Sequence, residues 1–223
     1  MKIVIINGSP RTDGVTAAIL HSMEKQLRDY GAEVTYFELS LLTMSQCKGC
    51  CACYSTGHCH INDDAEKLSI AISKADGLVL GSPTYASNVS GYMKLMIDRG
   101  HFVIEQLLTG KYCVTVATGE NYGSRNTSKI MNDLVLYSGG QLTQKIVLNV
   151  PFNSVRNDNK PVQKTGSSAA QKLYRDISKQ RKYPFQIFLN RIIFTFGIRP
   201  FVNRKGKLYK GVVEKWREYS LVN

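Results

Sequence analysis

Five short apolar runs recur along the chain, and longer segments with apolar positions at helical spacing separate them. The runs at 2–6, 33–39, 77–81, 112–117 and 141–150 are rich in β-branched and aromatic residues and predict strands. The segments at 16–30, 63–74, 90–108 and 124–137 predict helices. Strand and helix therefore alternate four times, and a fifth strand closes the series.

This alternation predicts an α/β fold in which helices cover both faces of a parallel sheet. In such sheets ligands bind at the carboxyl ends of the strands, near the point where the strand order reverses. We therefore expect a binding site in the loops that follow the first, third and fourth strands.

The net charge of +12 is unevenly distributed. Residues 1–150 carry 13 basic and 13 acidic residues, whereas residues 151–223 carry 16 basic and 4 acidic residues. This asymmetry predicts a domain over 1–150 and a basic extension over 151–223. The start MKIVII predicts no signal peptide, and no long uncharged apolar run predicts a transmembrane segment, so we expect a cytoplasmic location.

The loop after the first predicted strand has the composition of a phosphate site. It reads GSPRTDGVT, with two glycines for a tight turn, hydroxyls on Ser9, Thr12 and Thr16, and Arg11 as a charged donor. It is neither a Walker loop nor a G-x-G-x-x-G fingerprint. A simpler interpretation, in which Ser9 and Thr16 only cap the next helix, remains open.

Five of the six cysteines lie within thirteen residues, at Cys47, Cys50, Cys51, Cys53 and Cys59. Four of them form C-x2-C-x2-C-x5-C, which can present three thiolates from one tight stretch and a fourth to close the shell. In a reducing compartment this crowding indicates metal binding or redox chemistry rather than disulfides. Three interpretations stay open: a [4Fe–4S] cluster, which we favour, no metal, and structural zinc, whose cysteine pairs are usually further apart.

Two loop motifs carry a resemblance to a known family. NGSPR at 7–11 follows the first strand and GSPTY at 81–85 follows the third. With both loops in these positions, residues 1–150 resemble the flavodoxin-like NAD(P)H-dependent FMN reductases. The cysteine run followed by Asp63 and Asp64 resembles the iron–sulfur flavoproteins within that group. The resemblance implies a flavodoxin-like, doubly wound, five-stranded parallel sheet of order 2-1-3-4-5.

The resemblance also implies which residues hold the cofactors. The FMN phosphate would be bound by Ser9, Arg11, Val15 and Thr16. The isoalloxazine ring would be lined by Pro83, Thr84, Tyr85, Asn88 and Val89. A third wall would be formed by Thr118, Gly119, Tyr122 and Gly123. The [4Fe–4S] ligands would be Cys47, Cys50, Cys53 and Cys59, with Cys51 outside the set.

The histidines and the sixth cysteine give weaker indications of function than the loops and the cysteine run. His58 and His60 flank Cys59 and are typical of a solvated loop, whereas His101 is expected in mid-helix with a structural role. Cys113 lies in a predicted strand and is expected in the core. No side chain is expected to be catalytic, because a flavin carries the chemistry itself.

The basic extension predicts a partner surface. Polar, turn-rich residues at 151–170 predict a linker, a basic helix follows at 171–181, and apolar residues crowd 185–198. We favour packing against another subunit, while peripheral contact with an anionic membrane and coverage of the flavin cleft remain open. No nucleic-acid partner is expected, since no binding motif accompanies the charge.

The favoured hypothesis is an FMN oxidoreductase that takes electrons from NAD(P)H. It would pass them to a small acceptor, or through the cluster to a protein partner, and the resemblance implies a homodimer or tetramer. One alternative is a non-catalytic electron carrier that docks a partner through its basic extension. Another is a zinc-stabilised interaction module.

Overall fold

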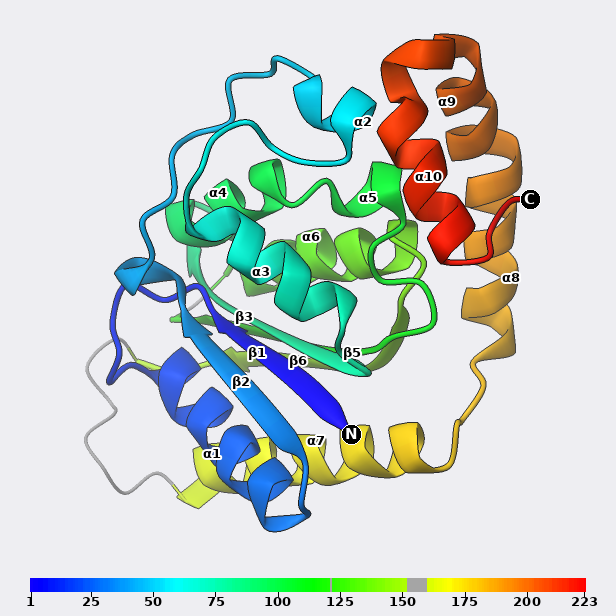
Figure 1. The fold of residues 1–223 in the computed structure, drawn as a ribbon. Coiled ribbons are helices and arrows are strands. Elements are labelled where there is room, and N and C mark those ends of the chain that lie inside the picture. The colour runs from blue at the N-terminus through cyan, green and yellow to red at the C-terminus, as the bar shows by residue number, and fades with distance from the viewer. Residues whose placement is uncertain (121, 152–159) are drawn as a thin grey trace.

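The computed structural model describes residues 1–120, 122–151 and 160–223, and it is built on one parallel sheet (Figure 1). The strands are β1 (Lys2–Asn7), β2 (Glu33–Glu38), β3 (Gly77–Tyr85), β5 (Tyr112–Gly119) and β6 (Gln141–Asn149), in the order β2-β1-β3-β5-β6. Numbered without the short additional strand described next, these five strands have the order 2-1-3-4-5, and the predicted order is confirmed. A short strand, β4 (Asn88–Val89), pairs antiparallel with the end of β3.

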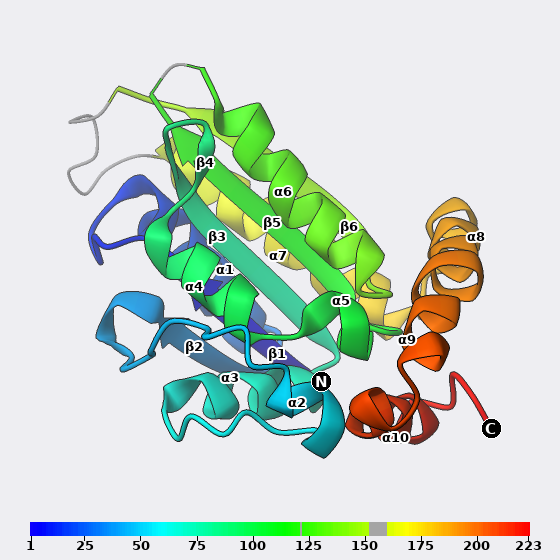
Figure 2. The same ribbon diagram turned by 90° about the horizontal axis from the view of Figure 1, so that it is seen from above.

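Helices cover both faces of the sheet, as predicted (Figures 1 and 2). One face packs against α1 (Val15–Asp29) and α7 (Lys160–Ser178). The other packs against α3 (Asp64–Ser73), α4 (Gly91–Arg99), α5 (Phe102–Glu105) and α6 (Ser124–Tyr137). Successive strand residues point to opposite faces, so Ile3 and Ile5 pack toward α1 while Val4 and Ile6 pack toward α3 and α4. Cys113 is buried in the second of these layers, as expected.

The helix α7 occupies part of the segment whose composition predicts a linker. Its buried positions include Val162, Gly166, Ala169 and Leu173, a helical spacing in which small residues stand between larger apolar ones. A Cβ at Gly166 would lie 2.6 Å from the carbonyl oxygen of Ile19, so glycine permits close approach to α1. The linker prediction is therefore wrong for 160–170, and its residues 152–159 lie outside the described part of the chain.

The single helix predicted over 90–108 is divided in two. The chain leaves α4 at Gly100 and enters α5 through His101, whose φ of 49° is left-handed. The break turns the fully buried ring of Phe102 into the core, 2.0 Å from where a Cβ on Gly100 would stand. His101 is thus at a helix junction, and the mid-helix prediction for it is wrong.

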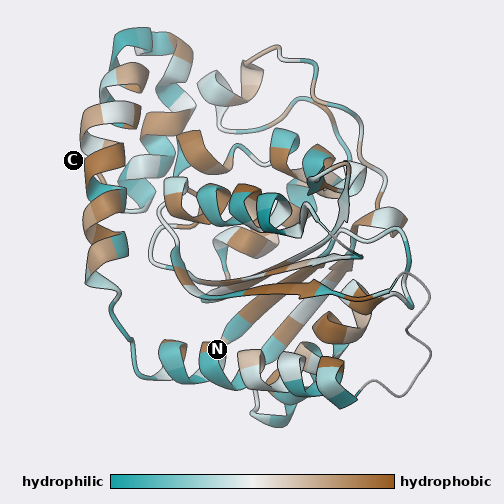
Figure 3. Cartoon of the chain, turned by 180° about the vertical axis from the view of Figure 1, so that it is seen from behind, coloured by the Kyte–Doolittle hydropathy of each residue, from teal (hydrophilic) through white to brown (hydrophobic). Residues whose placement is uncertain are grey.

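The C-terminal residues form a helical arm beside the sheet. It comprises α8 (Pro184–Ile192), a π-helical turn at Ile193–Ile198, α9 (Arg199–Lys205), a 3-10 turn at Gly206–Tyr209 and α10 (Lys210–Glu218). A third apolar cluster, around the fully buried Trp216, joins the arm to α5. Hydrophobic stretches also run along the outside of the arm (Figure 3), where Phe185, Phe188 and Phe196 are exposed. Among the described residues no helix has both the length and the apolarity needed to cross a membrane.

Between β2 and α3 the chain forms the cysteine loop, defined here as residues 45–61. It holds the one-turn helix α2 (Ala52–Thr56) and follows a 3-10 turn at Leu39–Leu41. Both ribbon views place α2 against α10 (Figures 1 and 2). Gly57 and Gly211 are in backbone contact there, since a Cβ on Gly211 would lie 2.2 Å from the nitrogen of Gly57. The arm therefore packs against the loop that carries the cysteines.

Candidate functional site

A pocket of about 300 Å³ opens at the carboxyl edge of the sheet, where the loops after β1, β3 and β5 meet. Ten of the thirteen predicted FMN residues line it: Ser9, Arg11, Val15, Thr16, Pro83, Thr84, Tyr85, Thr118, Gly119 and Tyr122. The lining also includes Gly14 of the predicted phosphate loop, and Ala86, Ser87, Glu120, Val150 and Pro151, which were not predicted as site residues. Parallel strands end together at one edge, and this is why residues more than 100 positions apart converge.

The first side of the pocket has the features of an anion site. Helix α1 begins after Gly14 with no side chain capping its N-terminus and no acidic residue in its first turn. Its first N–H groups and its positive dipole end therefore face the pocket. The Thr16 hydroxyl lies 2.7 Å from that of Thr118, which ties this loop to the end of β5. The Arg11 N–H donates to the Ser9 hydroxyl at 3.1 Å and so closes the turn.

The second side is a β-hairpin that the sequence did not reveal. Thr84 pairs with Val89 and Tyr85 with Asn88, so that Ala86 and Ser87 form a two-residue turn. Both turn residues have left-handed φ angles, 49° and 59°, as two-residue hairpin turns require. Asn-Gly is the usual signal for such a turn, and Ala-Ser carries none of it.

Three predicted residues lie outside the pocket lining. Val89 is buried in the core, and the Asn88 carbonyl accepts a hydrogen bond from Thr127 of α6 at 2.9 Å. Gly123 has a φ of 93° and precedes α6, and a Cβ there would lie 2.9 Å from the Cα of Ser87. Gly123 thus lets the third loop approach the hairpin closely without contacting the pocket.

Two buried hydroxyls at or next to the pocket have unused hydrogen-bonding capacity, and of the two residues Thr84 lines the pocket. Within the described residues, Oγ1 of Thr84 and Oγ of Ser124 have no hydrogen-bond partner. Both stand beside Gly119, where a Cβ would lie 2.3 Å from the Ser124 hydroxyl. Buried hydroxyls without partners are destabilising, so a ligand that bonds to Thr84 would recover that free energy. The donors, the helix N-terminus and the flat wall of Tyr85 fit an anionic, aromatic cofactor such as FMN.

The five clustered cysteines surround a second, smaller cavity of about 20 Å³. Cys47, Cys50 and Cys51 are exposed, while Cys53 and Cys59 are half-buried. Among the described residues no three His, Cys, Asp or Glu side chains converge as a preformed metal site. The donor chemistry fits an iron–sulfur group, but the cavity would have to widen to hold one, and Cys51 lines it together with the four predicted ligands.

The surroundings of these thiols are charged. Burial, with the negative charge of Glu105 next in importance, raises the pKa of the Cys53 thiol to about 11. A metal that bound Cys53 would therefore have to displace its proton. Cys50 Sγ lies 3.4 Å from Nδ1 of His60, and Cys59 Sγ lies 3.5 Å from the Arg99 guanidinium.

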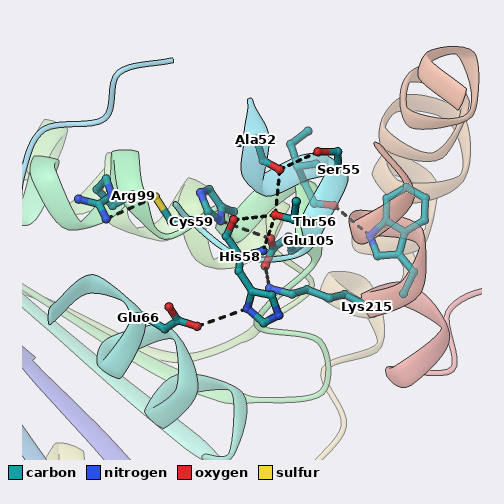
Figure 4. A network of polar contacts seen from close by, with 12 residues as sticks. Ala52, Ser55, Thr56, His58, Cys59, Glu66, Arg99, Glu105 and Lys215 are labelled. Atoms are coloured by element: carbon teal, nitrogen blue, oxygen red, sulfur yellow. Dashed lines mark hydrogen bonds and ion pairs between the residues drawn. The ribbon is translucent and has the colours of Figure 1, made fainter. Parts of the chain in front are cut away.

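Polar contacts surround the place where the cysteine loop packs beside the arm (Figure 4). Lys215 reaches from α10 to the buried Glu105, with 2.6 Å between Nζ and Oε2. His101 approaches the other carboxylate oxygen at 3.3 Å. His58 is largely exposed and pairs with Glu66 of α3 at 3.3 Å. These contacts join α10 to α5 and the cysteine loop to α3.

Helix α4 joins the two cavities. At its start the Ser90 hydroxyl caps the helix through the Met93 N–H and donates to the Gly8 carbonyl beside the pocket. At its end Arg99 lines the cysteine cavity. A nine-residue helix spans about 13 Å, so the two cavities lie at opposite ends of one rigid element.

The chain matches one known family over about two thirds of its length and individual relatives over all of it. The family described as NADPH-dependent FMN reductase matches residues 1–153. An iron–sulfur flavoprotein of Clostridioides difficile (strain 630) is 32% identical, and the match covers 100% of both chains. This chain belongs to the NADPH-dependent FMN reductase family, in its iron–sulfur flavoprotein subgroup. The predicted family is therefore confirmed, and membership makes the protein a flavin-binding oxidoreductase.

Other relatives agree with this family membership. An iron–sulfur flavoprotein of Archaeoglobus fulgidus is 28% identical over 100% of both chains. Among solved structures, an apo NADH:FMN oxidoreductase has a TM-score of 0.57 at 17% identity, covering 83% of this chain and 92% of that one. A flavone reductase has a TM-score of 0.62 at 18% identity, and the match covers 82% of this chain and 66% of that one. At these identities the structures show a shared fold.

Proposed function

We propose that this chain is an NAD(P)H-dependent FMN oxidoreductase whose FMN binds in the pocket at the carboxyl edge of the sheet. We also propose that Cys47, Cys50, Cys53 and Cys59 hold a [4Fe–4S] cluster. Electrons would then pass from the flavin to a small acceptor, or through the cluster to a partner. The observation that carries the proposal is the pocket itself, which gathers Ser9, Arg11, Thr84 and Thr118 from three loops. When bound, FMN supplies hydride and single-electron chemistry.

The chain's own residues bind and orient this cofactor. The N-terminus of α1 and the Arg11 guanidinium supply positive charge for the phosphate. The Thr84 hydroxyl is a hydrogen-bonding group for the polar edge of the ring, and Tyr85 supplies a flat wall. The hairpin turn at Ala86 and Ser87 shields one side of the pocket from water.

The first experiment measures FMN binding and its reduction. Protein loaded with FMN is mixed anaerobically with NADH or NADPH, and the flavin absorbance is followed. We expect bleaching with at least one nucleotide, and no bleaching with either would refute the reductase function. FMN bound but reduced only by an added protein donor would instead favour the non-catalytic electron carrier.

Two matched variants test the location of the pocket. A charge-assisted hydrogen bond contributes about 1.5–3 kcal/mol, so R11Q is expected to raise the Kd for FMN by about tenfold or more. R125Q removes the same charge from the exposed first turn of α6, outside the pocket lining, and should leave the Kd unchanged. Equal Kd values for the two variants would show that FMN binds elsewhere.

The cluster is tested by cysteine substitution. Iron and sulfide are quantified after anaerobic reconstitution of the wild type and of single Cys→Ser variants. Substitution of Cys47, Cys50, Cys53 or Cys59 is expected to lower the iron content sharply while FMN binding is retained. C51S is the matched control, because Cys51 lines the same cavity and is not a proposed ligand. Stoichiometric zinc without iron would contradict the cluster.

A further inference from the structure

A single buried side chain closes the neck of the cysteine loop. Arg99 is the last residue of α4, and its side chain is 1% exposed. Its Nη1 donates to the Ser45 carbonyl at 2.6 Å, and its Nη2 donates to the Ile61 carbonyl at 3.5 Å. These two carbonyls are the two ends of the loop, so one guanidinium holds both against α4.

The partner of Arg99 is a carboxylate that also ties the loop to α3. Arg99 binds Asp63 through two parallel hydrogen bonds, 2.8 Å to Oδ2 and 2.9 Å to Oδ1. The same carboxylate accepts from the Ser45 N–H at 2.8 Å and from the Ala65 N–H at 3.1 Å, which caps α3. Burial alone would raise the pKa of Asp63, but the bonds from Arg99, Ser45 and Ala65 outweigh it and lower the pKa.

The same guanidinium contacts one cysteine directly. Nη2 of Arg99 donates to Sγ of Cys59 at 3.5 Å (Figure 4). Cys59 is the cysteine nearest in sequence to the Ile61 end of the neck. A sulfur in this position has a fixed hydrogen-bond donor and a positive charge beside it.

We propose that Arg99 is a positioning residue for the cysteine loop, closing its neck and placing a hydrogen bond and a positive charge on the Cys59 sulfur. This inference rests on the proposed function, in which Cys59 is a cluster ligand. Hydrogen bonds to ligand sulfurs and nearby charge set the reduction potential of iron–sulfur groups. Positive charge favours the reduced, more negative state, so Arg99 raises the potential of the cluster that the loop holds.

We expect arginine to be required here, because its planar guanidinium can donate several hydrogen bonds in fixed directions. The guanidinium serves Ser45, Asp63, Ile61 and Cys59 at once, whereas a lysine ammonium is a point charge with three donors. R99K therefore keeps the charge but loses part of the geometry. R99Q loses both the positive charge and the guanidinium's hydrogen-bond geometry.

The experiment compares R99K and R99Q with the control K94Q in the full chain. Lys94 lies on the same helix and pairs with Asp98 on its exposed side, so K94Q removes a charge without touching the loop. Hydrogen exchange across 45–61 is measured in metal-free and iron-loaded protein. The cluster potential is measured by EPR-monitored titration. A residue that only supports the fold would change the exchange but not the potential.

We expect faster exchange of 45–61 in R99K and R99Q, with K94Q equal to wild type. We expect the potential to shift negatively in R99K and further in R99Q. If R99Q does not fold, the double variant D63N/R99Q removes the uncompensated buried carboxylate and replaces it in the series. Wild-type exchange and potential in R99K would overturn the inference.

The two proposals fail separately. If the wild type takes up no iron, the cluster fails, and with it the role of Arg99 on Cys59. Hydrogen exchange of the metal-free protein then still decides whether Arg99 closes the neck. If iron is bound and the potential of R99Q equals that of the wild type, the cluster stands and the electrostatic role of Arg99 is refuted.

Discussion

Removing Lys215 should loosen the helical arm from the rest of the protein. Lys215 is the partner of Glu105, whose side chain is 2% exposed, and the two charged atoms are 2.6 Å apart. The variant K215M keeps the length of the aliphatic chain but leaves the carboxylate buried without its cation. Loss of one partner from a buried ion pair typically costs about 3–5 kcal/mol.

The lower end of that range applies here. Lys215 is itself 22% exposed, so water reaches its side of the pair, and the polar ring of His101 stands 3.3 Å from the other oxygen of Glu105. We expect K215M to destabilise the docked arm by about 3 kcal/mol, which is roughly a hundredfold rise in the undocked population. The double variant E105Q/K215M removes both charges and should recover most of this loss.

The chain contains its own probe for this prediction. Trp216 is the only tryptophan, is fully buried in α10, and donates to the Ile104 carbonyl at 2.9 Å. Urea titration followed by tryptophan fluorescence therefore reports undocking of the arm, while circular dichroism reports the whole fold. K210M is the control, because Lys210 pairs with Glu214 in solvent at 3.5 Å and such pairs contribute about 1 kcal/mol or less. Equal midpoints for K215M and K210M would refute the reasoning.

Three further predictions follow from the geometry. G123A should weaken FMN binding, measured by flavin fluorescence, because the added Cβ would meet the hairpin turn. The control G110A has a similar positive φ but stands in open space, so it should leave FMN binding unchanged. G211V should undock α10 and lower iron uptake, whereas G197A, with nothing within 4 Å, should do neither. The pKa of Asp176 is lowered, because hydrogen bonds from Lys172 and Tyr183 outweigh the effect of burial. Its stabilisation is therefore complete above the ordinary Asp pKa of about 3.9 and is lost as pH falls through the lowered value. In D176N the free energy of unfolding should therefore depend less on pH in this acidic range, as measured by acid unfolding.

The sheet could be predicted because its central strands β1, β3 and β5 are apolar runs that are almost entirely buried, while the edge strands β2 and β6 carry apolar residues at only some positions. Helix α6 was predicted with the bounds Ser124–Tyr137 that the structure has, since its apolar positions repeat cleanly and a glycine precedes it. The meeting of the three loops followed from the same pattern, because parallel strands place their carboxyl ends together. Local periodicity was sufficient for both.

Contacts distant in sequence could not be predicted in this way. Arg99 and Asp63 are 36 residues apart, and an arginine at the end of an amphipathic helix is usually solvated. The first half of helix α7 was missed because its buried residues include Gly166, Ala169 and Ala170, and glycine and alanine are also common in linkers. The Ala86-Ser87 turn was missed because the pairing of β3 and β4, rather than the residues themselves, imposes its φ angles.

The contact between Gly57 and Gly211 joins two segments of the chain that are synthesised at different times. At a translation rate of about 5–20 residues per second, the cysteine loop leaves the ribosome roughly eight to thirty seconds before α10. During that interval α2 has no helix to pack against, and thiols in an unbraced loop are open to oxidants and to stray metal ions. Stable loading of the loop is therefore expected to be a post-translational step, completed only when the arm has folded back onto it.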